Sequence, residues 1–345
     1  MTIINLLDLS IILNNSKICL KHSPRKLKED YENSGKYHLE GNRIGSENKK
    51  KAPLVYVIIV NFNGLEYTRR CLESLERAKY PNFETLVIDN GSERLESEII
   101  KERFPNLIKT IRLKNNIGFA GGNNVGINYA LKEGADYFFL LNNDTLVNPD
   151  VLEELVAFAN KDPRIGIVGP KVFVLRNGKQ TNLVQSFGAR VNLYLGETPL
   201  IGGQVDQGQF EEPFCVDYVS GCAMLVKRNV IEDLGFLDPR YFMYVEEVDY
   251  CLRAKRRGFQ IWSVPKARIW HKGEASATDL QRLYYRVSSL IIFERIHAPK
   301  LGFILFTLYF AFVKVPILST RLFLKKPLDT IVTLVKAFRK GFSTV

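Results

Sequence analysis

The chain has 345 residues, of which 46% are hydrophobic and 25% charged, and this balance excludes a largely disordered protein. Its net charge of +11 is uneven. Residues 1–51 hold ten basic and six acidic residues, residues 298–345 hold eight and one, and residues 52–297 are neutral. A neutral centre disfavours nucleic-acid binding, whereas a basic tail favours attraction to an anionic membrane surface.

The cysteines and the first residues indicate a cytoplasmic protein. The cysteine count is odd and no C-x-x-C pair occurs, so we interpret the cysteines as small hydrophobic residues in a reducing compartment: Cys19, Cys71, Cys215, Cys222 and Cys251. The first 15 residues are apolar but lack a basic region and a cleavage site, and they contain Asp8. We therefore expect no secretory signal.

Segments with strand-like and helix-like apolar patterns alternate along the first part of the chain. Residues 1–51 are mostly polar without a period, and predict a mobile leader ahead of a folded domain over 52–297. We predict strands at 54–60, 83–89, 110–113, 136–141 and 165–175. We predict helices at 65–79, in a segment that ends at 104, at 122–133 and after Asn148. The last of these helices would have Asn148 as its N-cap and Pro149 in its first turn. This alternation predicts an α/β fold with a mostly parallel sheet flanked by helices.

The second half of the chain is less regular. Residues 176–216 predict loops with a small antiparallel excursion, 217–228 and 260–271 predict strands, and 246–258 predicts a helix.

The tail over 298–345 predicts membrane-associating helices. Residues 301–313 carry no charge but are followed by Lys314 and Pro316, so the segment is too short for the roughly 20 residues of a spanning helix and favours interfacial burial. Residues 331–342 predict a basic amphipathic helix suited to a membrane surface. The alternative is a helix packed on the domain or on a second subunit.

Polar residues follow four of the predicted strands, on the edge where ligands bind in open α/β sheets. They are Asn61 and Asn63, then Asp89, Asn90 and Ser92, then Asn115 and Asn116, and then Asn142, Asn143 and Asp144. Each cluster alone is typical of turn chemistry. Four clusters on one edge favour a ligand site.

The run NNIGFAGGNNVG holds Gly118, Gly121, Gly122 and Gly126, which would let the backbone approach an anion at a helix N-terminus. The chain has neither G-x-G-x-x-G nor G-x-x-x-x-G-K-[ST]. A dinucleotide oxidoreductase and a P-loop ATPase are therefore both disfavoured.

Two groups of residues are candidates for chemistry. Asp144 ends a predicted strand and could bind a metal with a diphosphate, with His271 completing the shell, although a capping acid and a structural histidine are the alternatives. Glu246, Glu247 and Asp249 begin a predicted helix, with 246 and 249 on one face. The alternative for these acids is stabilisation by the helix dipole, but the apolar lead-in before them favours one partly buried general base.

These motifs together resemble the inverting family 2 glycosyltransferases of GT-A fold, particularly the rhamnosyltransferase-like branch. The matching pieces lie in the family's order over about 54–275: VIIVNFNG, LVIDNGS, NNIGFAGGNNVGI, FLLNNDT, VSGCAMLVKR, LGFLDPRYFMYVEEVDYCLRAKRRG and IWHKGEAS. Residues 284–295 are similar to the segment that leads this branch into its membrane-associating tail.

The resemblance implies a role for each matching residue. Asn61, Asn63 and Asp89 would line the base and ribose, and Asn116, Gly118, Gly122 and Asn124 would hold the diphosphate-sugar. In LNNDT, Asn142 replaces the first Asp of the metal motif, which leaves Asp144, with His271, to bind Mg²⁺ or Mn²⁺. In EEVD, Glu247 is the base, and Gly221, Glu246, Asp249, Arg253 and Trp270 would lie on the acceptor side or support the site.

The reaction implied is a single displacement that inverts the anomeric carbon, with a nucleoside-diphosphate sugar as donor. dTDP-rhamnose is favoured and a UDP-hexose comes next. The acceptor would be a glycan or lipid-linked hydroxyl in cell-envelope polysaccharide synthesis, at the inner face of the cell membrane. The alternatives are a sugar nucleotidyltransferase, for which only Arg69 and Arg70 stand near the first loop, and a membrane-docked scaffold that binds sugar nucleotide without turnover.

Overall fold

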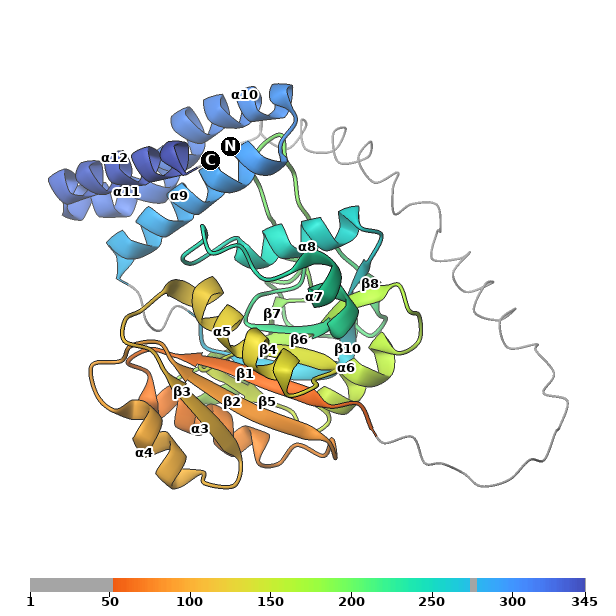
Figure 1. Ribbon diagram of the computed structural model, residues 1–345. Helices are drawn as coiled ribbons and strands as arrows, with labels where there is room; N and C mark the ends of the chain where they lie inside the picture. Colours follow the sequence, from red (N-terminus) through yellow and green to blue (C-terminus); the bar gives the residue numbers. More distant parts are fainter. Residues whose placement is uncertain (1–51, 274–277, 345) are drawn as a thin grey trace, which may run out of the picture. The chain divides into compact units, whose positions relative to one another are not determined.

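The computed structural model describes residues 52–273 and 278–344 (Figure 1). The chain divides into two units, Met1–Lys51 and Ala52–Val345, and only the second is described below. The leader predicted over 1–51 lies outside the described residues.

A mixed sheet forms the centre of the described unit, in the order β3-β2-β1-β4-β9-β6-β10-β5. Strands β3, β2, β1, β4, β6 and β10 run in one direction, and β9 runs against β4 and β6. The strand bounds are β1 (Val55–Asn61), β2 (Phe83–Asp89), β3 (Ile108–Arg112), β4 (Tyr137–Asn142), β5 (Thr145–Val147), β6 (Ile165–Arg176), β7 (Lys179–Ser186), β8 (Phe214–Cys215), β9 (Ala223–Lys227) and β10 (Gln260–His271). The mostly parallel α/β fold predicted from the alternation is confirmed.

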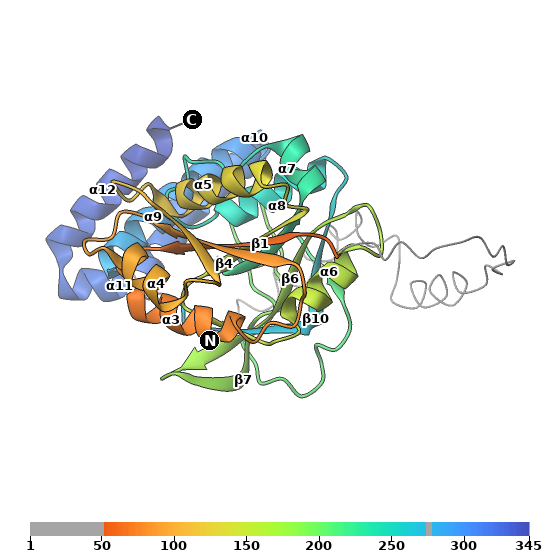
Figure 2. The same ribbon diagram turned by 60° about the horizontal axis from the view of Figure 1, so that its bottom comes forward.

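Helices cover both faces of this sheet, because its apolar strands have no polar face (Figure 2). One core holds residues of α3 (Leu65–Leu75), α4 (Glu96–Arg103) and α6 (Val151–Ala159). The other core holds residues of α5 (Gly118–Lys132), α7 (Arg228–Leu234) and α8 (Glu246–Arg256).

Several predicted boundaries are wrong, among them the start of the strand predicted at 217–228, which begins at Ala223 as β9. Helix α5 begins at Gly118 rather than 122, because the backbone N–H of Phe119 donates to the carbonyl of Phe242, a contact far along the chain. Helix α6 has Asp150 rather than Asn148 as N-cap, since the Asn148 side chain instead accepts from the Asp150 N–H in a local turn. Helix α3 ends at Leu75, four residues before the predicted end at 79. Elements β5 and α7 are additions to the prediction.

Four helical segments follow the sheet: α9 (Asp279–His297), α10 (Lys300–Tyr309) with the π-helical η3 (Phe310–Lys314), α11 (Val315–Lys325) and α12 (Pro327–Ser343). Lys300–Lys325 forms one helix of 26 residues, long and apolar enough to cross a membrane by length and composition. The predicted break at the proline is wrong, because Pro316 lies in the first turn of α11 after a wider π turn, where its missing N–H is tolerated.

Helix α12 has features of both alternatives predicted for it, a helix on a membrane surface and a helix packed on the domain. Ala337 and Gly341 are buried against α9, where Gly341 faces Ile291. Ile331 and Val335 of the predicted stripe are exposed. One face of α12 therefore packs on the domain, and another leaves apolar side chains uncovered.

Candidate active site

The carboxyl end of β1 is held by a closed network of side chains. Asn61 is fully buried, and its amide nitrogen donates to Glu96 at 2.8 Å while its oxygen accepts from Thr68 at 2.7 Å. Glu96 also accepts from the Gly64 N–H, which fixes the turn after β1. Asn63, with φ of 48°, is exposed beside this turn. The side-chain oxygen of Asn63 accepts from the Glu93 N–H at 2.9 Å, so its exposed amide nitrogen is the group that would meet a ligand, whereas both polar atoms of Asn61 are engaged by the protein.

Asp89, at the end of β2, is also buried and paired within the chain. Its carboxylate accepts from the backbone N–H groups of Ser92 at 3.0 Å and Ser97 at 3.4 Å, and Arg112 lies 3.8 Å away. The structure thus gives Asp89 the task of shaping the 89–97 loop.

In space, the glycine run lies between the loop that follows β2 and the segment that precedes α8. Buried Asn90 donates to Asn116 and to the Gly118 carbonyl, both at 3.0 Å, and Asn116 accepts from the Gly118 N–H at 2.9 Å. Gly118 has φ of 82°, and a Cβ there would stand 2.4 Å from the Phe242 oxygen, so glycine is required. Gly122 lies inside α5 against Val60, rather than at the start of the helix as predicted.

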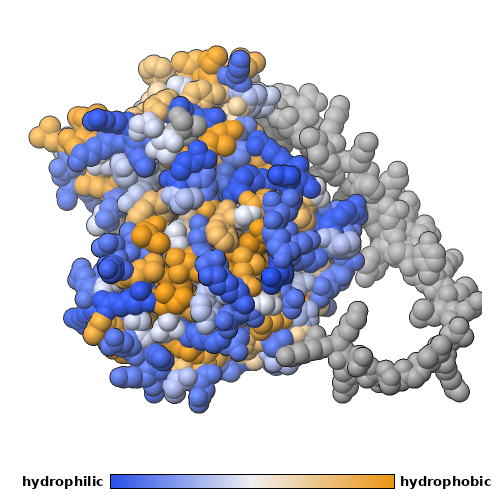
Figure 3. All heavy atoms as spheres, in the orientation of Figure 1, coloured by the Kyte–Doolittle hydropathy of each residue, from blue (hydrophilic) through white to orange (hydrophobic). Residues whose placement is uncertain are grey.

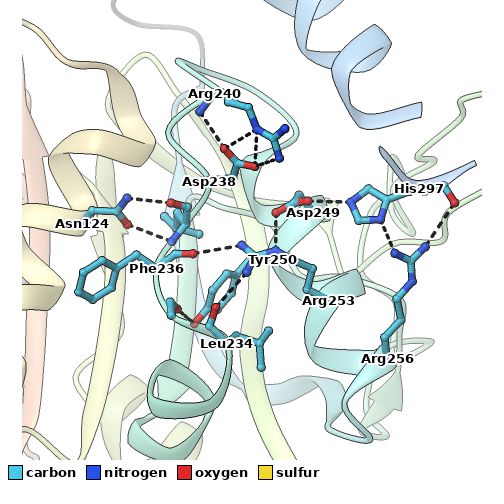
Figure 4. A network of polar contacts seen from close by, with 12 residues as sticks. Asn124, Leu234, Phe236, Asp238, Arg240, Asp249, Tyr250, Arg253, Arg256 and His297 are labelled. Carbon is cyan, nitrogen blue, oxygen red and sulfur yellow. Dashed lines mark hydrogen bonds and ion pairs between the residues drawn. The ribbon is translucent and has the colours of Figure 1, made fainter. Parts of the chain in front are cut away.

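Asn124 joins α5 to the segment that precedes α8 (Figure 4). Its side-chain oxygen accepts from the Leu237 N–H at 3.0 Å, and its nitrogen donates to the Leu237 carbonyl at 2.8 Å. Both ends of the amide are therefore used by the protein, and the structure supports a positioning role rather than the predicted contact with the sugar.

Asn142, Asp144 and His271 come together because β5 runs antiparallel to β10, with His271 opposite Thr145. His271 Nε2 lies 3.2 Å from Asp144 Oδ1 and 3.4 Å from the Asn142 amide nitrogen, and His271 Nδ1 lies 2.9 Å from Gln185 Oε1. The partner at Nδ1 orients the ring so that Nε2 faces Asp144.

The electrostatics of this pair favour an ionised Asp144. Burial raises the pKa of the Asp144 carboxyl, but the hydrogen bond and the charge of His271 outweigh it and leave the pKa below its usual value. Burial lowers the pKa of His271, but Cys222 and Asp144 outweigh it and raise that pKa well above its usual value.

The residues around Asp144 fit a divalent cation bound together with a diphosphate. Asn142 Oδ1 is buried and has no hydrogen-bond partner among the described residues, so an oxygen ligand stands ready beside the carboxylate. Within residues 52–273 and 278–344, no three His, Cys, Asp or Glu side chains cluster as a complete metal cage. This matches Mg²⁺, which takes one or two carboxylates and fills its shell with phosphate and water oxygens.

Helix α8 begins from a strained turn. Tyr244 and Val245 have φ of 69° and 73°, a left-handed conformation that costs on the order of 1–3 kcal/mol for each such residue. Strain of this size persists only where the surroundings fix it, and here it aims Glu246 and Glu247 from the start of the helix.

The two glutamates differ in their surroundings. Glu246 is buried, its Oε2 has no partner among the described residues, and burial followed by the charge of Glu247 raises its pKa well above the usual value. Burial also raises the pKa of Glu247, opposed by backbone hydrogen bonds from Glu247, Gly221 and Val248. Of the pair, Glu247 is the one placed to hold a negative charge.

The Ser220–Cys222 turn connects the metal residues to Glu247. The Asn142 N–H donates to the Cys222 carbonyl at 2.9 Å, and Cys222 also contacts His271. A Cβ on Gly221 would lie 3.3 Å from the carboxyl carbon of Glu247. The same turn of three residues thus contacts Asn142 and His271 and also Glu247.

Asp249 and Arg253 anchor α8 to neighbouring segments of the chain (Figure 4). Asp249 is buried between Arg253 Nε at 2.8 Å and His297 Nε2 at 2.7 Å, and His297 Nδ1 accepts from Arg256 at 2.7 Å. Arg253 also donates to the Phe236 carbonyl. Asp249 and Arg253 are therefore supporting residues, and so is Trp270, whose Nε1 donates to the Thr181 carbonyl.

Four contributors were absent from the predicted site: Thr68, Glu96, Gln185 and His297. Ser92 was named in a strand-end cluster but was given no role of its own. Gln185 and His297 are 86 and 48 residues from the side chains they contact, and no sequence spacing indicates such pairs.

Comparison with known families decides the class of the protein. The model of the family "Glycosyltransferase like family 2" matches residues 52–287. The chain belongs to glycosyltransferase family 2. It is therefore an enzyme of that class, not the nucleotidyltransferase or the scaffold considered from the sequence, and the predicted resemblance is confirmed.

Curated relatives of the glycosyltransferase are named for hexosyl and rhamnosyl transfer. The hexosyltransferase Agl10 of low-salt glycan biosynthesis in Haloferax volcanii is 27% identical, over 66% of this chain and 70% of its own. The N-acetylglucosaminyl-diphospho-decaprenol L-rhamnosyltransferase of Mycobacterium tuberculosis is 26% identical, over 65% and 78%. The dTDP-rhamnosyl transferase RfbF of Shigella flexneri is 24% identical, over 72% and 82%. Other relatives are much longer, and the match spans 18% of the O-antigen biosynthesis protein RfbC of Myxococcus xanthus.

Solved glycosyltransferases share the fold. The mannosyltransferase PcManGT from Pyrobaculum calidifontis, in complex with GDP-Man and Mn²⁺, aligns with a TM-score of 0.51 at 16% identity, over 85% of this chain and 88% of its own. S. aureus TarS 1–349 with UDP-GlcNAc aligns with a TM-score of 0.54 at 16% identity, over 83% and 81%. The GT-A architecture predicted from the motifs is confirmed.

Proposed function

We propose that this glycosyltransferase moves a sugar from a nucleoside diphosphate to a hydroxyl of a glycan or lipid-linked acceptor, with inversion in one displacement. The observation that carries the proposal is that one turn, Ser220–Cys222, contacts Asn142 and His271, which pairs with Asp144, and also contacts Glu247. A leaving group and an attacking hydroxyl need partners that are held close to one another in this way.

The donor side is the edge formed by the loops after β1, β2 and β3. Asn63 and the Asn116–Gly118 turn border the space for the nucleotide, while Asn61 and Asp89 hold the loops that form it. dTDP-rhamnose is the favoured donor, supported by the relatives named for rhamnosyl transfer, and a UDP-hexose is the second.

Asn142, Asp144 and His271 would hold Mg²⁺ or Mn²⁺ together with the diphosphate. When bound, the cation would neutralise charge on the departing nucleoside diphosphate. The chain itself contributes an ionised Asp144, an unpartnered Asn142 oxygen and His271, whose Nε2 would bind the cation after losing its proton while Gln185 holds Nδ1.

Glu247 is the proposed general base. It takes the proton from the acceptor hydroxyl as that oxygen attacks the anomeric carbon, and the bond to the diphosphate breaks. The raised pKa matches the proton affinity of Glu247 to this task, while the Gly221 N–H keeps the carboxylate available as the anion. Buried Glu246 stays protonated next to it and leaves the negative charge on Glu247.

We also propose that the segment after residue 297 attaches the enzyme to the inner face of the cell membrane. The C-terminal helices expose large apolar side chains, among them Phe312, Ile317, Leu324 and Leu328 (Figure 3). Deleting residues 298–345 would uncover the core between α9 and α12, so the better test replaces Leu324 and Leu328 with serine. Cosedimentation with anionic vesicles should fall, while the circular dichroism spectrum stays the same.

The test of the activity is a donor screen with Mg²⁺ or Mn²⁺ that measures nucleoside diphosphate release with and without a lipid-linked acceptor. We expect release with dTDP-rhamnose, loss with a chelator, and inversion in the product by NMR. A product that retains the donor configuration would contradict the assignment of Glu247 as base.

A further inference from the structure

A cavity of about 230 Å³ lies where the segment before α8 meets the C-terminal helices. Arg240 and Phe242 line it from that segment, Tyr284, Tyr285 and Ser289 from α9, and Lys340 from α12. The cavity is too small for a whole glycolipid, since ligand pockets for drug-sized molecules span about 300–1,000 Å³. It suits a head group with the rest of the molecule outside.

The lining of the cavity is continuous with the segment that leads into the strained turn at Tyr244 and Val245. Phe242 stacks on Tyr285 with ring centres 4.7 Å apart, and Ser289 Oγ donates to the Met243 carbonyl at 2.9 Å. The Phe242 carbonyl in turn accepts from the Phe119 N–H at 2.7 Å, in the first turn of α5. A ligand in the cavity therefore lies against the segment that leads into Glu246 and Glu247.

The polar lining is cationic. Asp238 holds Arg240 through Nε and Nη2, and no described residue hydrogen-bonds its Nη1. Lys340 forms no ion pair with the residues that the structure describes, and no carboxylate lines the cavity. Two cations beside aromatic rings favour an anion attached to an apolar or sugar group.

From these contacts we infer that the cavity binds the phosphate of a lipid-linked acceptor, between Arg240 and Lys340. The inference rests on the proposed function and names its acceptor class. Helix α12, which carries Lys340, also exposes apolar side chains, among them Val335 and Phe342, and these would contact the lipid. The aromatic rings of Phe242 and Tyr285 would contact the first part of the ligand beyond the phosphate.

The test measures binding of farnesyl diphosphate to the full chain by calorimetry, with farnesol and inorganic pyrophosphate as comparison ligands. Lys340→Glu should weaken farnesyl diphosphate on the order of tenfold, as expected for loss of a charged hydrogen bond. Arg339→Glu is the matched control, because it makes the same charge change at the neighbouring exposed position, which does not line the cavity. It should change the dissociation constant less than twofold.

Equal losses in the two variants would overturn the inference, because they would indicate general attraction to the basic tail. Farnesol or pyrophosphate binding as tightly as farnesyl diphosphate would overturn it as well. Binding of dTDP reports the donor site and should be the same in Lys340→Glu and in the unmodified chain. An unmodified chain that fails to bind dTDP would count against the proposed donor, while the farnesyl diphosphate result would still decide the cavity.

Discussion

The side chains of Asn61, Asp89 and Asn124, on the β1–β2–α5 side of the sheet edge, have protein partners at both polar atoms. Asn142 Oδ1 and Glu246 Oε2, on the β4–α8 side, have none among the described residues. A buried polar atom without a partner costs roughly 1–3 kcal/mol. Satisfied groups therefore build the scaffold of this site, and unsatisfied groups indicate where a ligand completes it.

Asp144→Ala gives the largest expected effect on the unsatisfied side. Asp144 is the one carboxylate in the LNNDT turn, which also holds Asn142, so metal-dependent turnover should be abolished while the thermal unfolding curve stays close to the original. Survival of activity within about threefold, roughly 0.65 kcal/mol of barrier, would remove Asp144 from the metal site.

His271→Ala is the milder companion of that change. Loss of one nitrogen ligand should raise the metal concentration needed for half-maximal rate, measured by titration with Mn²⁺. An unchanged titration would return His271 to a structural role beside Gln185.

Glu247→Gln should lower kcat by about 10²–10⁴-fold, because a positioned base contributes that much. Donor affinity should stay the same, since the base faces the acceptor. In the unmodified enzyme the rate should rise with pH through the raised pKa of Glu247, because only the ionised form accepts a proton.

Glu246→Gln is the matched control for Glu247. Glutamine has the shape of the protonated acid that the raised pKa of Glu246 implies, so kcat should change little. A larger loss from Glu246→Gln than from Glu247→Gln would exchange the two assignments. Asp249→Asn is a poor control, since it breaks the buried contacts with Arg253 and His297.

Asn124→Ala tests the satisfied side. Removal of the amide leaves the Leu237 N–H and carbonyl without their partner, which should lower the free energy of unfolding by about 1–3 kcal/mol in urea. Donor KM should change less than acceptor KM, because Asn124 holds the segment before α8. A loss of donor binding with unchanged stability would instead restore the predicted contact with the sugar.

Glu294→Gln should give the smallest effect, on stability alone. Glu294 is fully buried on α9 without a partner for either oxygen among the described residues, and burial raises its pKa to about 8. The folded state therefore keeps a proton that the unfolded state loses, so this group makes stability fall as pH rises from about 4.3 towards 8. The substitution should raise the melting temperature by a few degrees at pH 8 and much less at pH 5.

Most of the fold could be predicted because its strands are long apolar runs that end at polar residues. β2 was predicted with both boundaries, and α8 and β10 with at least their first residues. The start of α5 and the cap of α6 could not be predicted, since distant or local hydrogen bonds set them. The uninterrupted Lys300–Lys325 helix depends on a π turn that no hydrophobic pattern indicates.

By itself, the sequence predicted most of the order of elements and the enzyme family, and it singled out Asp144, His271 and Glu247 as candidates, because residue type and strand position restrict their chemistry. Only the tertiary structure decided which polar groups are already used. Asn61, Asp89 and Asn124 look as suitable for a ligand as Asn142 does until their partners are known. The physical reason is that a hydrogen bond depends on what stands within about 3 Å, and folding brings those partners from segments far apart in the chain.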